Sequence, residues 1–484
     1  MTVARVRCAR SGEFLATVLD PGSFRSWDTP DPRPVRASAA YRRELVDAAA
    51  AAGVDESITT GEGSVDGQPV AVAVSDFGFL AGSIGSVAAR RLVAAVEHAT
   101  EARLPLLLSP ASGGTRMHEG TPAFLEMVGI AAAVTRHRAA GLLVLSYLRH
   151  PTTGGSLASW GSLGSVTVAE SGALVGFLGP KVYRALRGHP FPHGVQTAEN
   201  LRGRGVLDAV ASPAQLRELL GRLLGLIGQP GPATPSATTE NPGPRGCPLP
   251  PWESVAATRR PDRPGLQDLL RRCAPEIVEL WGTGAGEVAA STVLCLTRFG
   301  AQSCVLVGQD RRKGAVAPQG PADLRVARRG FRLAEELRLP LVTVIDTAGG
   351  DLSPDAENGA LAGEIARCLS KMSTLTVPSV SVLAGQGAGG AALALFPADR
   401  RIAALHAWLT PLPPEGASAI VHGTPDRAAE VVSTQMIRSV DLAEIGAVHR
   451  IVAESPNGAE HCDGFLDRLA TTIEQEIRVA KTRH

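Results

Sequence analysis

The 484-residue chain has no excess of charge of either sign, because 48 lysine and arginine residues offset 47 aspartate and glutamate residues. A net charge of +1 gives the protein no general attraction to nucleic acid or to an anionic membrane. We therefore expect neither nucleic acid nor a membrane as partner. A polyanionic ligand would have to be held by a local cluster of basic side chains.

The seven cysteines lack the spacing that zinc sites and disulfide frameworks require. Their number is odd and no Cys-x-x-Cys pair occurs. The sequence therefore predicts no metal in this chain and favours a reducing, cytoplasmic location.

Long apolar runs are also missing. The N-terminal region has no apolar segment long enough for a secretory signal. The one long uncharged run, residues 377–396, is interrupted by Gln386 and several glycines, so it predicts a buried strand followed by a short buried helix rather than a membrane span.

What the chain does contain is enough residues for two large domains, because single cores stop growing near ~250 residues. Residues 228–251 hold eight prolines and almost no apolar periodicity, which is the composition of an extended linker. The predicted organisation is an N-terminal domain over residues 1–227, a proline-rich linker over 228–251 and a C-terminal domain over 252–484.

The two halves repeat one plan. Leu104-Pro105 and Leu339-Pro340 each precede a buried strand and a glycine pair, at an offset of 235 residues (339 − 104). The pairs Gly154-Gly155 and Gly389-Gly390 stand at the same offset (389 − 154 = 235). A constant offset over this length indicates duplication of a domain.

Each copy alternates strands with helices. Residues 122–140 and 361–376 carry apolar residues at i, i+3 and i+4 and predict helices, whereas residues 142–148 and 379–384 predict buried strands. This alternation predicts an α/β fold in which helices cover a sheet in each half.

Glycine pairs follow the predicted strands at four places. Backbone N–H groups at a strand-to-helix turn can face a ligand only if no side chain blocks the approach, which favours glycine there. Each half can therefore form an oxyanion hole, a set of main-chain amides that stabilises developing negative charge. The four turns are Ser112-Gly113-Gly114, Thr153-Gly154-Gly155, Ala348-Gly349-Gly350 and Ala388-Gly389-Gly390.

Other interpretations of these loops are weaker. A single glycine pair can simply make a tight turn, but four pairs in matched register argue against that. "GQGAGG" at residues 385–390 fits the dinucleotide pattern G-x-G-x-x-G, yet the helix after it ends by Pro397 and no acidic residue follows at the required spacing. His118 and His150 lie near the loops as candidate general acids or bases, although loop histidines are more often polar surface residues.

At these loops the sequence resembles a known family. Residues 109–127, "SPASGGTRMHEGTPAFLEM", residues 150–183 and residues 196–210 look like the β subunit of the carboxyltransferase of bacterial acetyl-CoA carboxylase. Residues 317–350, 385–395, "GQGAGGAALAL", and 411–421, "PLPPEGASAIV", are similar to its α subunit. The resemblance covers about residues 60 to 470.

The whole chain thus resembles a fused acyl-CoA carboxylase carboxyltransferase of the actinobacterial kind, with two tandem crotonase-like domains. The resemblance implies transfer of a carboxyl group from carboxybiotin to the α-carbon of an acyl-CoA, giving malonyl- or methylmalonyl-CoA from acetyl- or propionyl-CoA. It also implies a homo-oligomer, with acyl-CoA held by the N-terminal domain and carboxybiotin by the C-terminal one. In this family the biotin enolate takes the proton, so no side-chain base is required.

The resemblance implies roles for particular residues by motif position. Gly154 and Gly155 are the expected catalytic residues on the acyl-CoA side, and Gly389 and Gly390 on the carboxybiotin side. Further substrate-binding residues are Gly113, Gly114, Thr153, Arg91 and Gly349, with Arg91 a contact for CoA; alternatively Arg91 belongs to a solvated helix face.

The chain departs from the family in three ways. It lacks the four-cysteine zinc ribbon of the bacterial β subunit. The "DTPG" turn of the α subunit is here Asp346-Thr347-Ala348-Gly349, followed by "GDLSPDAE". No biotin-bearing Met-Lys motif and no ATP-grasp module occur, so the biotin carboxyl carrier protein and biotin carboxylase must be other chains.

Two other functions stay open from the sequence alone. One is a biotin-independent acyl-CoA decarboxylase or hydratase, in which His118 or a carboxylate transfers the proton. The other is a non-catalytic subunit of a carboxylase complex.

Overall fold

The computed structural model describes residues 10–29, 37–228, 247–455 and 462–484. Most of the predicted proline-rich linker therefore lies outside the described residues. The chain divides into two compact units, Met1–Gly225 with Gly284–Gly286, and Leu226–Thr283 with Glu287–His484.

The first unit is built on a seven-stranded sheet of order β1-β2-β3-β4-β5-β7-β9, and β6 pairs with β8 outside it. Its strands are β1 Arg25–Ser26, β2 Ile58–Val65, β3 Gln68–Ser75, β4 Leu106–Ser109, β5 Val144–Leu148, β6 Thr152–Thr153, β7 Val166–Glu170, β8 Val175–Gly176 and β9 Ala209–Ala211. Its helices are α1 Ser11–Val18, α2 Ala39–Ala52, α3 Ser86–Glu101, α4 Gly120–Ala139, α5 Gly154–Ser156, α6 Pro180–Arg187, α7 Ala198–Gly203 and α8 Pro213–Ile227.

The second unit has an equivalent sheet of order β10-β11-β12-β13-β14-β15-β17, with β16 paired to β14. Its strands are β10 Ile277–Leu280, β11 Thr292–Phe299, β12 Gln302–Gln309, β13 Leu341–Thr347, β14 Ser379–Ala388, β15 Arg400–Ala404, β16 Trp408–Thr410 and β17 Arg450–Val452. Its helices are α9 Pro251–Arg259, α10 Leu266–Cys273, α11 Arg311–Gly314, α12 Pro321–Leu337, α13 Pro354–Asn358, α14 Leu361–Ser373, α15 Gly389–Leu393, α16 Pro414–His422, α17 Ala428–Thr434, α18 Ser439–Glu444 and α19 Cys462–Lys481.

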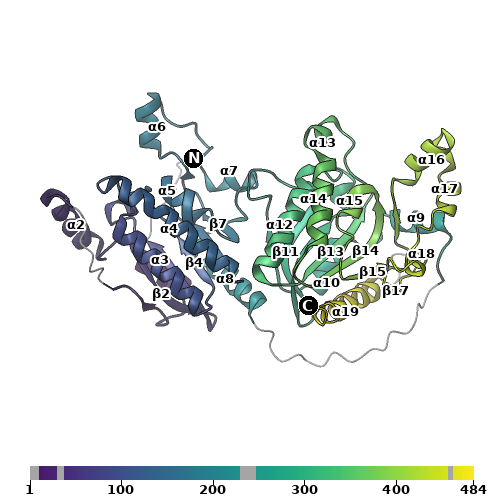
Figure 1. The fold of residues 1–484 in the computed structure, drawn as a ribbon, viewed down its shortest axis with the longest axis horizontal. Helices are drawn as coiled ribbons and strands as arrows, with labels where there is room; N and C mark the ends of the chain where they lie inside the picture. The colour runs from purple at the N-terminus through teal and green to yellow at the C-terminus, as the bar shows by residue number, and fades with distance from the viewer. Residues whose placement is uncertain (1–9, 30–36, 229–246, 456–461) are drawn as a thin grey trace. The chain divides into compact units, whose positions relative to one another are not determined.

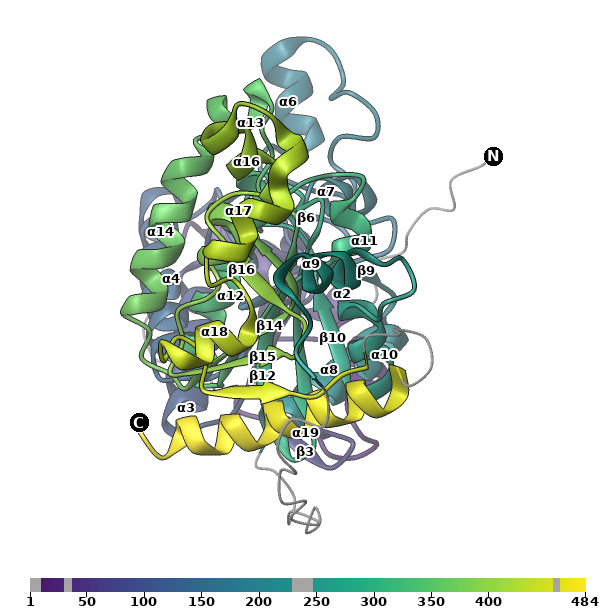
Figure 2. The same ribbon diagram turned by 90° about the vertical axis from the view of Figure 1, so that its right-hand side faces the viewer.

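Helices cover the sheets, as the α/β alternation predicts. In the first unit α3 and α4 lie side by side against the sheet, and in the second unit α12 and α14 do the same (Figure 1). Figure 2 shows the long helix α19 running along the second sheet beside α10. Central strands such as β4, β5 and β13 are buried at every residue, which explains why their sequences are mostly apolar and do not alternate between apolar and polar residues.

The strand registers show the duplication directly. Leu106 pairs with Val144 in the first unit and Leu341 with Ser379 in the second, each at an offset of 235 residues (341 − 106 and 379 − 144). The residue pairs that form β-bridges beside the glycine loops obey the same offset. Ile84 pairs with Thr115 in the first unit, and the equivalent residues Gln319 and Gly350 pair in the second. Likewise Ser112 pairs with Thr152, and the equivalent Thr347 pairs with Gly387.

The helices and strands predicted from the sequence are present, with shifted ends. The predicted helix 122–140 is α4, and the predicted helix 361–376 is α14. The run 377–396 contains β14 followed by the short helix α15, as predicted. β14 continues four residues past the predicted strand 379–384 because Gln386–Ala388 pair with Trp408–Thr410. No helix among the described residues is long and apolar enough to cross a membrane.

One glycine sets how closely α12 packs on the second sheet. A Cβ on Gly330 would lie 2.3 Å from Val307 Cγ2 and 2.8 Å from Leu294 Cδ1. We predict that Gly330→Val lowers stability by about 1–3 kcal/mol through overpacking. Thermal unfolding measures this; Arg332→Ala, an exposed position on the same helix, should leave the transition in place. An unchanged transition in Gly330→Val would contradict the packing described.

Candidate active site

Two glycine loops of the first unit pack backbone against backbone. One follows β4 and contains Gly113 and Gly114, and the other joins β6 to α5 at Gly154. Gly114 has φ +108° and Gly154 has φ +61°, a left-handed region that favours glycine. A Cβ on Gly154 would lie 3.3 Å from both Gly113 O and Gly114 Cα. The approach is therefore available only to residues without a side chain.

Hydrogen bonds hold these two loops together. The Ser112 amide donates to Pro151 O (2.7 Å), and the Thr153 amide donates to Ser112 O (2.9 Å). Ser156 Oγ donates to Ser112 Oγ (2.8 Å), which in turn accepts the Gly114 amide (3.0 Å). The relative position of the loops is thus set before any ligand binds.

These bonds decide which amides are available to a ligand. The Gly113 amide donates to Ala81 O and the Gly154 amide to Phe177 O, each at 2.9 Å. The amides of Gly155 and Thr115 have no hydrogen-bond partner within the described residues, and both residues are partly exposed. A Cβ on Gly155 would lie 3.7 Å from Thr115 N, so the two amides are neighbours.

The second unit repeats this arrangement. Gly349 has φ +131° and Gly389 has φ +70°, matching Gly114 and Gly154 at the offset of 235. The Gly349 amide donates to Thr347 Oγ1 (3.1 Å), as the Gly114 amide does to Ser112. The amides of Gly350 and Gly390, at the positions of Thr115 and Gly155, have no partner among the residues that the structure describes, and both residues are partly exposed. The amide of Gly389 has no partner there either, unlike that of Gly154.

The turn on the expected biotin side departs from the family pattern but keeps an ordered geometry. Asp346, 2% exposed, accepts the Gln386 amide (3.0 Å) where the β13–β14 register shifts. Arg311 Nε lies 3.6 Å from Asp346 Oδ2. Burial raises the pKa of the Asp346 carboxyl above its ordinary value, although the positive charges of Arg311 and Arg263 oppose this shift. The carboxyl group thus joins β13 to β14 just before the glycine loop.

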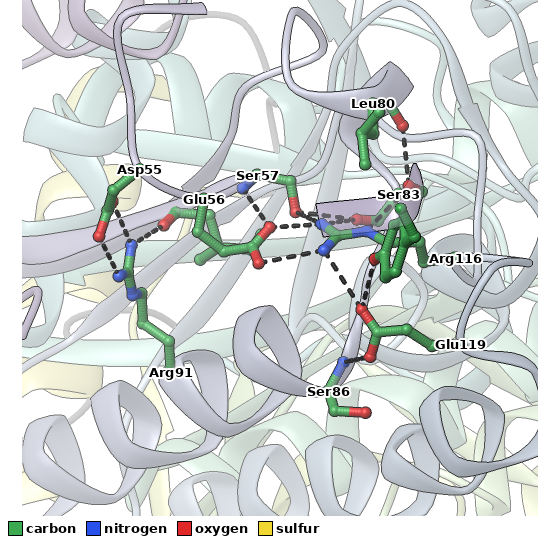
Figure 3. A network of polar contacts seen from close by, with 11 residues as sticks. Asp55, Glu56, Ser57, Leu80, Ser83, Ser86, Arg91, Arg116 and Glu119 are labelled. Atoms are coloured by element: carbon green, nitrogen blue, oxygen red, sulfur yellow. Dashed lines mark hydrogen bonds and ion pairs between the residues drawn. The ribbon is translucent and has the colours of Figure 1, made fainter. Parts of the chain in front are cut away.

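The first glycine loop continues into a buried arginine that sequence reasoning missed. Arg116 is 1% exposed and contacts Glu56 through both terminal nitrogens (Figure 3). It also donates to Ser57 Oγ (3.1 Å) and Ser83 O (2.8 Å) and lies 3.4 Å from Glu119 Oε1. In the sequence Arg116 is one of several charged residues after the glycines, so no local pattern marks it as buried.

Glu119 completes this network. Its carboxylate accepts the Ser86 amide (2.7 Å) at the start of α3 and the Tyr41 hydroxyl (2.8 Å) of α2. Burial opposes ionisation, but the hydrogen bonds from Ser86 and Tyr41 and the charge of Arg116 hold the pKa of Glu119 below its ordinary value. This charged network therefore fixes the glycine loop to α2, to α3 and to the two residues just before β2.

Arg91 does not lie on a solvated helix face. Its side chain is 8% exposed, and its guanidinium donates to both carboxylate oxygens of Asp55 (2.9 and 2.7 Å) and to Ile58 O (3.0 Å) (Figure 3). These bonds occupy the guanidinium within the first unit. Contact with CoA stays a prediction.

The two loop histidines have structural contacts. His118 is 48% exposed, stacks on Tyr41 at 4.9 Å between ring centroids and lies 3.3 Å from Glu44. His150 Nδ1 accepts the Leu174 amide (3.1 Å), and burial lowers the pKa of its ring despite the charge of Glu170. In the part of the chain that the structure describes, no group of three or more His, Cys, Asp or Glu residues is placed to hold a metal ion.

The chain matches the model of the carboxyl transferase domain over residues 13–445, and it therefore belongs to that family. It is 56% identical over 466 residues to the probable biotin-dependent acyl-coenzyme A carboxylase beta3 subunit of Mycobacterium tuberculosis, covering 96% of this chain and 93% of the relative. It is 36% identical to the acetyl-coenzyme A carboxylase carboxyl transferase subunits beta/alpha of Saccharopolyspora erythraea, covering 96% and 84%.

Among solved structures, transcarboxylase 12S with methylmalonyl-coenzyme A and methylmalonic acid bound matches with a TM-score of 0.77 and 20% identity, covering 98% of this chain and 90% of that one. This likeness supports the fold of two tandem crotonase-like domains. The resemblance found in the sequence is confirmed, and the protein is a carboxyltransferase.

The buried network around Arg116 can be tested by removing its charge. We predict that Arg116→Met lowers stability by about 3–5 kcal/mol, because two carboxylates lose their buried cation, and lowers carboxyltransferase activity because the glycine loop loses its anchor. Thermal unfolding and activity assays measure both. Arg136→Met is the control, since its pair with Glu97 is more than half exposed on both sides and is worth at most about 1 kcal/mol. Equal effects in the two variants would contradict the network.

Glu119 gives a pH-dependent prediction. Its lowered pKa means that its ionised form stabilises the fold above the ordinary glutamate pKa, about 4.3, and that this contribution is lost as the pH falls through the lower folded value. Glu119→Gln should therefore unfold at a lower temperature than the unmodified protein at pH 7, and the gap should narrow below about pH 4. A gap that stays constant with pH would show that the charge of Glu119 is unimportant.

Proposed function

We propose that the protein transfers a carboxyl group from carboxybiotin, borne by a carrier protein, to the α-carbon of an acyl-CoA. The observation that carries this proposal is the pair of open amides in each unit, at equivalent positions of a duplicated fold. The relatives named as biotin-dependent acyl-coenzyme A carboxylase and acetyl-coenzyme A carboxylase subunits support it.

Carboxyl transfer of this kind has two oxygens on which negative charge develops. One is the thioester oxygen of the acyl-CoA and the other is the ureido oxygen of biotin. Preorganised amides that meet such charge typically contribute about 2.7–4 kcal/mol each to transition-state stabilisation. The number and duplication of the open amides match this requirement.

On the acyl-CoA side, we assign the donor role to Gly155 and Thr115. Gly154, Gly113 and Gly114 allow the two loops to meet, and Thr153 holds the loops together through its amide bond to Ser112 O. Gly154 thus acts through its conformation, because its own amide is bonded to Phe177 O. This side would bind the thioester without any side-chain base.

On the carboxybiotin side, we assign the donor role to Gly350 and Gly390. Gly349 and Gly389 have positive φ angles, and each directly precedes one donor. Gly350 lies after β13, and Gly390 lies at the start of α15. The residues present suit a ureido oxygen, because the amides of Gly350 and Gly390 are two hydrogen-bond donors without a partner within the described residues, and both residues are partly exposed. Carboxybiotin supplies the carboxyl group, and the chain supplies the amides that orient it.

The substrates and partners follow from the same proposal. We infer acetyl-CoA or propionyl-CoA as acceptor, a role in fatty acid biosynthesis, a cytoplasmic location, and biotin carboxylase and biotin carboxyl carrier protein as separate chains. A homo-oligomer is the proposed assembly, in keeping with the hexamer that transcarboxylase 12S forms.

The assignment predicts the effect of placing a side chain beside each set of open amides. In Gly155→Val the new side chain would stand beside Thr115, since the Cβ alone lies 2.8 Å from Thr115 Oγ1. Both variants keep the amide N–H, but the added side chain must displace the loop that positions it. We expect Gly155→Val and Gly390→Val each to lower the rate of carboxyl transfer from malonyl-CoA to free biotin by at least about 10²-fold, the size of effect that follows the loss of one oxyanion donor. Calorimetry should show that Gly390→Val still binds malonyl-CoA.

Matched controls are Gly203→Val and Gly265→Val, because a Cβ at either position meets no atom within 4 Å. Both should transfer carboxyl groups at the rate of the unmodified protein. Full activity in Gly155→Val or Gly390→Val would overturn the assignment of the donors.

A further inference from the structure

A pocket lined by arginines opens beside the second glycine loop. It has a volume of about 820 Å³ and lies between the end of α9, α11 and the start of α16. Its charged lining residues are Arg259, Arg260, Arg311, Arg312 and Glu415. Four of these five residues are arginines, and three of the four also contact an aspartate outside the lining. We call this site the arginine pocket.

The arginine pocket shares residues with the turn that bears the open amides. Ala348, which directly precedes Gly349, lines it, and so does Gln386 of β14. Pro413 also lines the pocket. A Cβ added to Gly349 would lie 3.6 Å from Pro413 Cγ. The arginine pocket therefore adjoins the turn that bears the open amides of Gly350 and Gly390.

The arginines differ in how their charges are used. Arg311 donates to the carbonyls of Thr258 and Arg263 and forms a fixed wall. The guanidinium of Arg259 donates two hydrogen bonds to the carboxylate of Glu415 (2.6 and 3.0 Å). These two arginines therefore define the shape of the pocket.

Arg260 and Arg312 form its accessible rim, with side chains 41% and 51% exposed. Each contacts one aspartate outside the pocket lining, Asp262 and Asp268 respectively. A guanidinium has five N–H donors, so a bond to one carboxylate leaves further donors for a second one. Arginine forks of this kind bind carboxylates and phosphates through two parallel hydrogen bonds.

We propose that the arginine pocket docks acidic residues of the carrier protein next to its biotinyl-lysine; this inference rests on the proposed function. The carrier must approach this turn because its biotinyl group is tethered to it. Carboxylates flanking the attachment lysine would meet Arg260 and Arg312, and the contact would raise the affinity and association rate for the carrier without acting on the reacting atoms.

The test compares two biotinyl-lysine peptides as carboxyl acceptors from malonyl-CoA, using the full chain at low salt. One peptide has aspartate and glutamate beside the biotinyl-lysine, and the other has serine and glutamine at the same positions. We expect kcat/KM to be at least tenfold higher for the acidic peptide, mainly through KM. Added salt should reduce this preference, since exposed charges are screened.

The double variant Arg260→Glu/Arg312→Glu should reduce the preference for the acidic peptide at least tenfold. Arg260→Gln/Arg312→Gln should reduce it by a smaller factor and serves if the charge reversal fails to fold. Arg332→Glu, an exposed position of α12 in the same unit, should keep the full preference.

Three results would overturn the inference while leaving the proposed function intact. The first is an equal kcat/KM for the two peptides in the unmodified protein. The second is an equal loss of kcat/KM for both peptides in the double variant. The third is a double variant in which only the KM for malonyl-CoA is raised, which would assign the pocket to the phosphates of CoA. Absence of carboxyl transfer to free biotin by the unmodified protein would instead refute the proposed function itself.

Discussion

The structure depends on the close approach of two backbone segments that only glycine permits. In each unit one loop after a buried strand meets a second loop that begins a short helix, and in the first unit a Cβ on Gly154 would lie 3.3 Å from Gly113 O. The positive φ values of Gly114, Gly154, Gly349 and Gly389 are part of the same constraint. The amides of Gly155 and Thr115 in the first unit, and those of Gly390 and Gly350 at the equivalent positions of the second, have no partner within the described residues.

Duplication has kept this constraint while the surroundings diverged. The first unit anchors its loop with the buried pair of Arg116 and Glu56, whereas the second unit uses Asp346, which bonds β14 across the register shift after Ile345. Residue 351, at the offset of Arg116, is an aspartate. The amide donors are therefore common to both units, whereas the side chains that hold the loops in place differ between the units.

The sequence predicted the features that depend on local pattern. The offset of 235, the helices α4 and α14, and the glycine turns all follow from residue types and spacing. The sequence did not separate Gly155 from Gly154, because which amide is already bonded depends on Phe177, a residue from a different strand connection. It also missed Arg116 and placed Arg91 on a solvated face or at CoA, since the partners Glu56 and Asp55 come from the distant loop before β2.

The central claim is that main-chain amides, one set in each unit, meet the two oxygens that become charged. A crystal structure of the full chain with an acyl-CoA and biotin bound tests this most directly. The account predicts the thioester oxygen about 3 Å from the amide nitrogens of Gly155 and Thr115, and the ureido oxygen about 3 Å from those of Gly350 and Gly390. Thioester or ureido oxygens bound by side chains, or lying away from these amides, would contradict it.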